Sequence, residues 1–290
     1  MTDKPGQERI RNAALAAAVE LGLPGTAGTT AELAARAGID ATVLARLFDV
    51  LACFGAATRD GDRLAIGVLE APRTARGAQA IATVARRGSP ITSRDPLSAQ
   101  HDLRYLLVDP IVVEDGTTVR EVAERIAPVV DTGSLLDAGG GLATYATAVL
   151  ARAPRARALV VDLPPMIAQA TPAPRLELRA GDLLDCDLGS GHRVALVSHV
   201  LHIVAPGDAQ RILERVHAAL APGGLLVVKE LRVASATGVL LALAMSLIEG
   251  ERTLEDTDQL SQRIAQAGFA DVAVEPLAST PDAVLLTARA

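Results

Sequence analysis

The chain has 290 residues, with 28 Lys and Arg against 34 Asp and Glu and a formal net charge of −6. This length suits two domains, and a hydrophobic content of 50% is ample for a buried core and excludes intrinsic disorder. The acidic balance argues against a nucleic-acid binder that depends on a basic surface. Cys53 and Cys186 form neither a disulfide framework nor a zinc spacing, so a reducing cytoplasm is expected.

Neither the N-terminus nor the longest apolar run has the pattern of a targeting or membrane-spanning segment. Residues 1–11 are polar and charged, with no apolar stretch of the kind that follows in a signal peptide. The longest apolar run, residues 238–248, is about half of the roughly 20 residues that a transmembrane helix needs. We therefore expect a soluble, cytoplasmic protein without a membrane partner.

The first segment predicts three helices and a hairpin. Apolar residues at helical spacing predict a helix over residues 8–21, and Thr29 and Thr30 open a short helix over residues 31–37. Asp40 is the expected N-cap of a helix over residues 41–53. A hairpin over residues 57–66 is expected to turn at Asp60-Gly61. This order of elements is typical of a winged helix.

A winged helix often binds DNA, but its third helix here has the wrong surface for that. Base and phosphate contacts need Arg, Lys, Asn or Gln along the exposed face. Most of this helix is apolar, at Val43, Leu44, Leu47, Phe48, Val50 and Leu51. We therefore expect no nucleic-acid partner and predict a packing or dimerisation module that makes the protein a homodimer through its N-terminal domain.

The middle of the chain is the least regular part. Residues 73–87 favour a basic, Ala-rich helix, residues 91–116 have no convincing period, and residues 117–127 favour another helix. The expected domains are therefore a winged-helix-like domain over residues 1–88, a helical connector over residues 89–130, and a catalytic domain over residues 131–290.

From Ser134 onward, strands alternate with helices. The expected strands cover residues 135–136, 158–162, 176–180, 194–198, 225–229, 272–274 and 284–287, and the expected helices cover residues 142–152, 209–220 and 258–267. Apolar strands between amphipathic helices predict an α/β fold with a doubly wound parallel sheet. A short link between the last two strands predicts that they are antiparallel.

A glycine-rich loop follows the first of these strands. The run LLDAGGGLA over residues 135–143 places Asp137 at the strand end and Gly139, Gly140 and Gly141 before a helix. Such glycines let a ligand approach the main chain at a helix N-terminus. The loop alone is weak evidence, because a structural turn would have the same glycines and the phosphate-binding Gly-Lys-Ser/Thr is missing.

Two further acids stand at strand ends and strengthen this interpretation. Asp162 ends the second strand, about twenty residues past the glycines, where an acid can accept both hydroxyls of a ribose. Asp182 follows the third strand, with Leu183 behind it, and suits an adenine ring. Open α/β sheets bind ligands at this edge, so the three acids together favour an adenosyl cofactor.

Taken together, these residues resemble the S-adenosylmethionine-dependent O-methyltransferases of small-molecule metabolism that carry an N-terminal winged-helix dimerisation domain. The resemblance covers nearly the whole chain. The similar segments, in order, are TTAELA (29–34), LARL (44–47), LLDAGGGLA (135–143), VVDLPPM (160–166), AGDLLD (180–185), LVSHVLHIV (196–204), LAPGGLLVVKE (220–230) and GERT (250–253). The implied fold is a Rossmann-like methyltransferase sheet with an antiparallel last strand, preceded by a mostly helical winged-helix domain.

The resemblance also implies roles for single residues. Asp137, Gly139 and Gly141 would line the methionine end of the cofactor. Asp162 would hold the ribose, Asp182 and Leu183 the adenine, and Ser198 would face the cofactor at the end of the fourth strand. Leu163 would also contact the cofactor. His202 matches the general base of the family, and Glu230 and Glu251 match the acids that flank it.

Several positions depart from the family pattern. Ala143 stands where the family usually has Gly, at little cost if the backbone there stays helical, and Ile203 replaces an Asp that usually follows the base. With 2 Tyr, 3 Phe and no Trp, an aromatic clamp on the substrate is not expected. We expect an aliphatic substrate wall instead, drawn from Leu240, Leu241, Met245 and Ile248.

Two functions remain open at this point. The first is methyl transfer to a hydroxyl of a bacterial secondary metabolite, with His202 as the base. The alternative is a repurposed relative that keeps the cofactor for a cyclisation, elimination or hydroxylation, favoured by the missing acid at Ile203 and the aromatic-poor pocket. No bound metal is expected, because His199 and His202 show no third ligand by spacing.

Overall fold

The computed structural model describes residues 5–69, 78–89, 116–249 and 254–290. The chain divides into two compact units, each built from two segments of the chain. Unit 1 comprises residues 1–113 and 233–254, and unit 2 comprises residues 114–232 and 255–290. The helix expected to begin at residue 73 is described only from residue 78, and the stretch without a period, residues 91–116, lies almost wholly outside the described residues.

Unit 1 contains the predicted helices and hairpin together with a further helix from late in the chain. Its elements are α1 (Pro5–Glu20), β1 (Ala27–Thr29), α2 (Thr30–Ala37), α3 (Ala41–Cys53), β2 (Ala57–Asp60), β3 (Arg63–Ile66), α4 (Ala78–Arg87) and α12 (Ala236–Glu249). The three strands form a small antiparallel sheet in the order β1-β3-β2. The strand β1 was not predicted, because a strand of three residues gives no alternating pattern.

Local side-chain hydrogen bonds explain where the helices of unit 1 begin. The hydroxyl of Thr29 accepts a hydrogen bond from the N–H of Glu32, whose carboxylate accepts one from the N–H of Thr29. Asp40 caps α3 by accepting from the N–H of Val43 at 2.9 Å, as predicted. The hairpin is also present, although its two linking residues are Gly61 and Asp62, one position later than expected.

The helix α12 changes the expected division of the chain. It lies in unit 1 and packs on α3 and α1, although its sequence position falls within the expected catalytic domain. The helix is apolar on nearly every side, and Leu240, Leu241 and Met245 are buried. Part of the apolar surface of α3 is therefore covered within the same chain.

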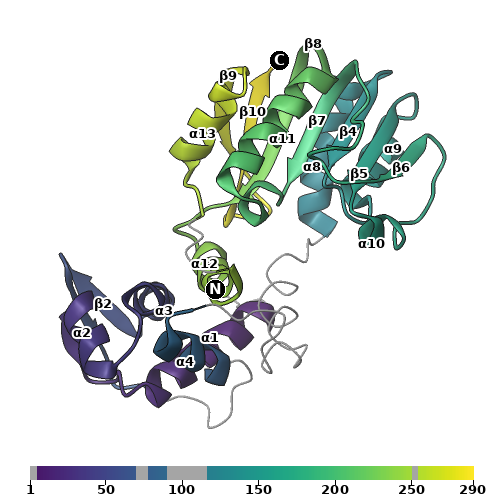
Figure 1. Ribbon diagram of the computed structural model, residues 1–290. Coiled ribbons are helices and arrows are strands. Elements are labelled where there is room, and N and C mark those ends of the chain that lie inside the picture. Colours follow the sequence, from purple (N-terminus) through teal and green to yellow (C-terminus); the bar gives the residue numbers. More distant parts are fainter. Residues whose placement is uncertain (1–4, 70–77, 90–115, 250–253) are drawn as a thin grey trace. The chain divides into compact units, whose positions relative to one another are not determined.

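Unit 2 is a sheet of seven strands with helices on both faces (Figure 1). Its strands are β4 (Ser134–Ala138), β5 (Arg157–Asp162), β6 (Leu176–Ala180), β7 (His192–Ser198), β8 (Leu220–Leu231), β9 (Ala270–Pro276) and β10 (Ala283–Arg289). Its helices are α8 (Gly116–Val130), α9 (Thr144–Arg152), the short α10 (Pro164–Ile167), the 3-10 turn η1 (Leu201–Ile203), α11 (Pro206–Ala219) and α13 (Thr257–Gln266). The helix α8, expected in a connector, thus belongs to unit 2.

The topology of the sheet confirms the predicted fold class. The strand order is β6-β5-β4-β7-β8-β10-β9, and the pairs from β6 to β8 are parallel. The strand β10 pairs antiparallel with both β8 and β9, so the antiparallel end of the sheet is confirmed. Because parallel strands end at one edge, the ends of β4, β5, β6, β7 and β8 are brought together there.

Candidate functional site

The glycine loop after β4 depends on the absence of side chains at two positions. Gly139 has a φ of +76°, and a Cβ there would collide with the side chain of Val200. A Cβ on Gly140 would lie 2.6 Å from Cγ of Asp137, so the loop passes directly over that carboxylate. The loop therefore packs at once on the end of β4 and on the segment that follows β7.

Ala143 corrects one sequence expectation. Its φ is +63°, in the left-handed region, and α9 therefore begins at Thr144 rather than at Leu142. A non-glycine residue in this conformation is strained by about 1–2 kcal/mol. The methyl group of Ala143 is fully buried, and burial of one such group contributes about 0.8 kcal/mol, which offsets much of the strain.

Asp137 is a buried carboxyl group with a raised pKa. Its side chain is fully buried, and neither oxygen has a hydrogen-bond partner within the described part of the chain. Burial raises the pKa of Asp137 to about 7, and the charge of Asp162 adds to this rise while the Ala146 amide opposes it. Such a group is stabilised as a carboxylate by any cation placed beside it.

Asp162 holds the glycine loop against the end of β5. Its Oδ2 accepts a hydrogen bond from the N–H of Gly141 at 2.7 Å, and its Oδ1 accepts one from the N–H of Leu163 at 2.6 Å. Each carboxylate oxygen can accept a further hydrogen bond. The predicted contact with a ribose is thus compatible with this geometry, and Asp162 has a loop-holding role that the sequence did not indicate.

The segment after β6 carries Asp182 and Leu183 and is fixed from α11. Oδ1 of Asp182 accepts from the N–H of Leu184 at 2.9 Å, which leaves this exposed carboxylate oriented by its own turn. Nε of Arg215 donates to the carbonyl of Leu183 at 2.8 Å, and its guanidinium also donates to the carbonyl of Cys186. Arg215 was not predicted as part of the site.

His202 lies in η1, just after β7, and meets Glu230, the last residue but one of β8, so the structure brings these two predicted residues together. Nδ1 of His202 lies 2.6 Å from Oε2 of Glu230, and the two side chains are only 6% and 4% exposed. The N–H of Leu201 donates to Oε1 of Glu230 at 3.0 Å. Burial alone would raise the pKa of Glu230, but the charge and hydrogen bond of His202, with smaller effects of His199 and Leu201, lower it.

This arrangement fixes the tautomer of His202. Because Glu230 is held as a carboxylate, it accepts, and Nδ1 of His202 must carry the donated proton. A neutral imidazole has one lone pair, which is then on Nε2. His202 is therefore prepared to accept a proton at Nε2 while Glu230 stabilises the resulting charge.

A second pair, Lys229 and His199, lies beside this dyad. Nζ of Lys229 lies 2.6 Å from Nε2 of His199, and Lys229 is only 1% exposed. The rings of His199 and His202 meet edge to face, with centroids 5.7 Å apart. Sequence reasoning missed Lys229, although a lysine within the apolar run LLVVKE of a strand buried on both faces is itself a signal.

The remaining predicted residues are placed differently. Ser198 ends β7, and its buried hydroxyl has no hydrogen-bond partner within the described ranges. Glu251 lies outside the described residues, so its predicted place beside His202 stays a prediction. Leu241 and Met245 are buried in α12 of unit 1, and their contact with a substrate stays a prediction.

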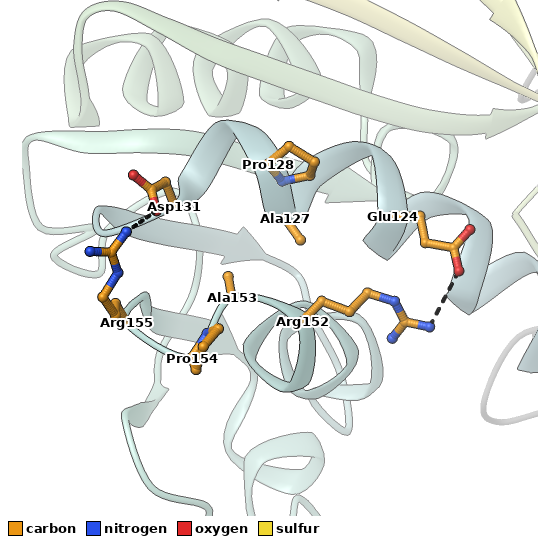
Figure 2. A pocket seen from close by; sticks show the side chains of 8 residues that line it. All are labelled: Glu124, Ala127, Pro128, Asp131, Arg152, Ala153, Pro154 and Arg155. Atoms are coloured by element: carbon orange, nitrogen blue, oxygen red, sulfur yellow. Dashed lines mark hydrogen bonds and ion pairs between the residues drawn. The ribbon is translucent and has the colours of Figure 1, made fainter.

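Unit 2 also has a cavity that does not belong to this site. It has a volume of about 530 Å³ and is lined by Glu124 of α8, by Asp131 just after α8 and by Arg152 of α9, among others (Figure 2). Arg155 pairs with Asp131 at 2.9 Å, and Arg152 pairs with Glu124 at 3.6 Å. The arginines are thus already paired with acids, and neither His nor Cys is among the residues that line this cavity.

Comparison with known proteins identifies relatives of this chain. The sequence profile of the O-methyltransferase domain matches residues 108–270. The chain is 32% identical over 161 residues to the N,N-dimethyltransferase OxyT of Streptomyces rimosus, a match that covers 51% of this chain and 46% of that protein. It is 31% identical over 146 residues to a 3-amino-4-hydroxybenzoate 4-O-methyltransferase of Streptomyces cremeus, covering 47% and 40% of the two chains.

The match to solved structures extends over more of the chain. An O-methyltransferase family 2 protein of Planctomyces limnophilus, solved in complex with apigenin, superposes with a TM-score of 0.62 at 20% identity. That superposition covers 98% of this chain and 93% of the other. The sequence matches to the two curated relatives, in contrast, span less than half of each relative's length.

The state of Asp137 predicts how stability depends on pH. The folded protein binds a proton at Asp137 up to about pH 7, whereas an unfolded chain releases it near pH 4. Between these values the folded state binds more protons, so the free energy of unfolding should fall as pH rises from about 4 to about 7. Asp137→Asn should remove this decrease and be more stable than wild type above pH 7, as measured by urea unfolding.

Asp185, an exposed carboxylate, provides the control for this experiment. In Asp185→Asn the side chain of Asp137 is unchanged, so the decrease in the free energy of unfolding between about pH 4 and about pH 7 should persist. Equal pH dependence in wild type and Asp137→Asn would contradict the assigned protonation state.

Proposed function

The chain belongs to the O-methyltransferase domain family, and on that premise we propose that it transfers a methyl group from S-adenosylmethionine to a hydroxyl of a small molecule. The acceptor we propose is a bacterial secondary metabolite. The observation that carries this proposal is the buried pair His202 and Glu230, at 2.6 Å, at the strand ends. It supplies a proton acceptor at the edge of the sheet where open α/β folds bind their ligands.

The residues at this edge fit the proposed cofactor. The carboxylate of Asp137 is buried without a hydrogen-bond partner in the described part of the chain, and S-adenosylmethionine carries an ammonium group and a sulfonium. The loop over Asp137 is less crowded at Gly141, where a Cβ would meet only Cε of Met166 at 3.6 Å, so a ligand can approach the main chain there. An unsatisfied carboxylate beneath a bare loop is the environment that a cationic ligand requires.

Each cofactor residue then has a distinct role. Asp137, Gly139 and Gly141 would bind the methionine end, Asp162 and Leu163 the ribose, and Asp182 and Leu183 the adenine, with Ser198 facing the cofactor from the end of β7. When bound, S-adenosylmethionine supplies an electrophilic methyl group. Arg215 would keep Leu183 in place by its hydrogen bond to the Leu183 carbonyl.

The proton of the acceptor hydroxyl would go to His202. A neutral hydroxyl is a poor nucleophile, so its proton must leave as the oxygen forms its bond to the methyl carbon. Nε2 of His202 accepts this proton, and the imidazolium is stabilised by the carboxylate of Glu230 through Nδ1–H. Leu201 donates to the other oxygen of Glu230 and so keeps the carboxylate in place.

Two alternative functions can be distinguished from this one by experiment. An amine acceptor is favoured by the similarity to OxyT, named as an N,N-dimethyltransferase, and a nitrogen with a lone pair needs less help from a base. A non-methylating reaction is favoured by Ile203, which is 47% exposed where the family usually has an acid. Incubation with S-adenosylmethionine and candidate acceptors, followed by mass spectrometry, distinguishes the three.

In that experiment an O-methylated product and released S-adenosylhomocysteine support our proposal. An N-methylated product supports the amine acceptor. A product that is isomerised or oxidised while the cofactor stays unconsumed supports the non-methylating enzyme and contradicts our proposal.

Asp162 provides a test of the cofactor site. Asp162→Ala removes the acceptor for the ribose hydroxyls and the anchor of Gly141, and each charge-assisted hydrogen bond contributes about 1.5–3 kcal/mol. Binding of S-adenosylmethionine, measured by calorimetry, should weaken at least about tenfold. The matched control is the exposed Asp185→Ala, which should bind as wild type does. Unchanged affinity in Asp162→Ala would exclude the assigned site.

His202 provides the test of the base. In His202→Ala, cofactor binding should stay near that of the wild type, whereas turnover should fall at least about a hundredfold. Glu230→Gln should reduce turnover in the same direction, because the neutral amide cannot stabilise an imidazolium. A loss of less than about fivefold in His202→Ala would mean that no general base is needed, and the amine or non-methylating function would then be preferred.

The proposed assembly is a homodimer through the N-terminal domain. Val19 of α1 is 44% exposed, and Leu15 is only half-buried, so α1 retains apolar surface that a second copy could cover. Light scattering should give twice the mass of the 29.9 kDa chain, and Val19→Asp should shift the population toward the single chain. A wild-type protein that has the mass of one chain at all concentrations would rule out this assembly.

No helix among the described residues is long and apolar enough to cross a membrane.

A further inference from the structure

Three potential metal ligands converge where the segment after β7 meets the last residues of β8. One ligand atom from each of His199, His202 and Glu230 lies within 4.8 Å of the other two. The sequence suggested only the two histidines, because Glu230 lies almost thirty residues later and is brought in by β8. Tetrahedral zinc holds its ligand atoms about 3.3 Å apart, from bond lengths of about 2.0–2.1 Å. Adjustments of about 1 Å would therefore bring all three onto one ion.

His199, one of the three potential ligands, has a left-handed backbone conformation. Its φ is +57°, in the left-handed region that non-glycine residues seldom adopt. This conformation turns the strand end so that the His199 ring meets the His202 ring edge to face. Strain of this kind persists where the surroundings impose it, and it gathers at functional sites.

The donor set has a definite chemical preference. Two imidazole nitrogens and one carboxylate oxygen are the ligands of catalytic zinc sites, which leave a fourth position to water or substrate. Mg²⁺ and Ca²⁺ prefer oxygen ligands only. Glu230 is further oriented by the N–H of Leu201, and carboxylate ligands of metals are commonly held by such hydrogen bonds.

We propose that His199, His202 and Glu230 form a site for a divalent cation of the zinc class, with its fourth position open. The inference does not depend on methyl transfer, since it rests on the donor atoms alone. The ion would replace the hydrogen bond between His202 and Glu230 and the one between Lys229 and His199.

Lys229 gives the proposal a specific signature. Nζ of Lys229 lies 2.6 Å from Nε2 of His199. A neutral imidazole has one lone pair, and an ammonium at Lys229 would take up the lone pair of His199 by donating to Nε2. A metal ion must compete for it and must also approach a buried positive charge. Replacement of Lys229 by Met, an apolar side chain of similar length, should therefore strengthen metal binding, whereas loss of a ligand should weaken it.

The same reasoning links the metal site to the proposed base. His202 also has a single lone pair when neutral, so it can either coordinate the ion or accept a proton. Metal occupancy and proton acceptance at His202 therefore exclude each other. If the proposed function is correct, zinc should inhibit turnover, and a chelator should restore it.

The test uses the full chain without S-adenosylmethionine. Zinc binding is measured by calorimetry, and Co²⁺ is added separately because tetrahedral Co²⁺ with nitrogen ligands has strong visible absorption. We expect one ion per chain and a tetrahedral Co²⁺ spectrum. His199→Asn, whose side chain tolerates the left-handed backbone, and Glu230→Gln should each weaken binding at least about tenfold. Lys229→Met should strengthen it.

His217→Gln is the matched control, because His217 lies on α11 and packs against Phe269 away from the cluster. It should leave zinc affinity unchanged. Thermal melts of each variant show whether it folds, and the Co²⁺ spectrum of a folded variant then reports on the ligands. Absence of saturable binding by the wild type, or binding that the ligand variants leave unchanged, would overturn the proposal. Neither result would affect the cofactor measurements with Asp162→Ala.

Discussion

One buried carboxylate organises the active end of unit 2. Glu230 is stable as an anion only because the N–H of Leu201 and the ring of His202 surround it. These partners stand on the short turn after β7, and the same turn places Val200 against Gly139 of the glycine loop. The hydrogen bonds of one side chain thus connect His202, through the turn after β7, with the loop over Asp137. A substitution at Glu230 is therefore expected to alter the position of both.

The elements that could be predicted from the sequence are those with local causes. The capping box at Thr29 and the N-cap at Asp40 set the beginnings of α2 and α3 through contacts three residues away. The strand β6 has its predicted bounds, because Pro174 and Gly181, which disfavour a strand interior, flank it in the sequence. The order of strands and helices then left few possible topologies, and the position of Asp137, Asp162 and Glu230 at one edge followed from it.

The features that could not be predicted depend on distant parts of the chain. The left-handed backbone at Ala143 and His199 could not be predicted, because Ala seldom adopts it and the enrichment of His there is too small to identify a single position. The pairing of Lys229 with His199 depends on the register of β7 and β8. Likewise, the apolar residues of α12 do not indicate which surface they cover, and their partner α3 lies near the start of the chain.

The two-segment composition of each unit affects how the protein can be synthesised and folded. Unit 1 lacks α12 until residue 249 has been made, and the sheet of unit 2 lacks β10, which inserts between β8 and β9, until residue 289. Unit 1 therefore cannot finish folding on the ribosome before residue 249 has emerged, and unit 2 cannot before residue 289 has emerged. The apolar surface of α3 and the edge of β8 stay open until then, and open apolar surfaces and strand edges favour aggregation.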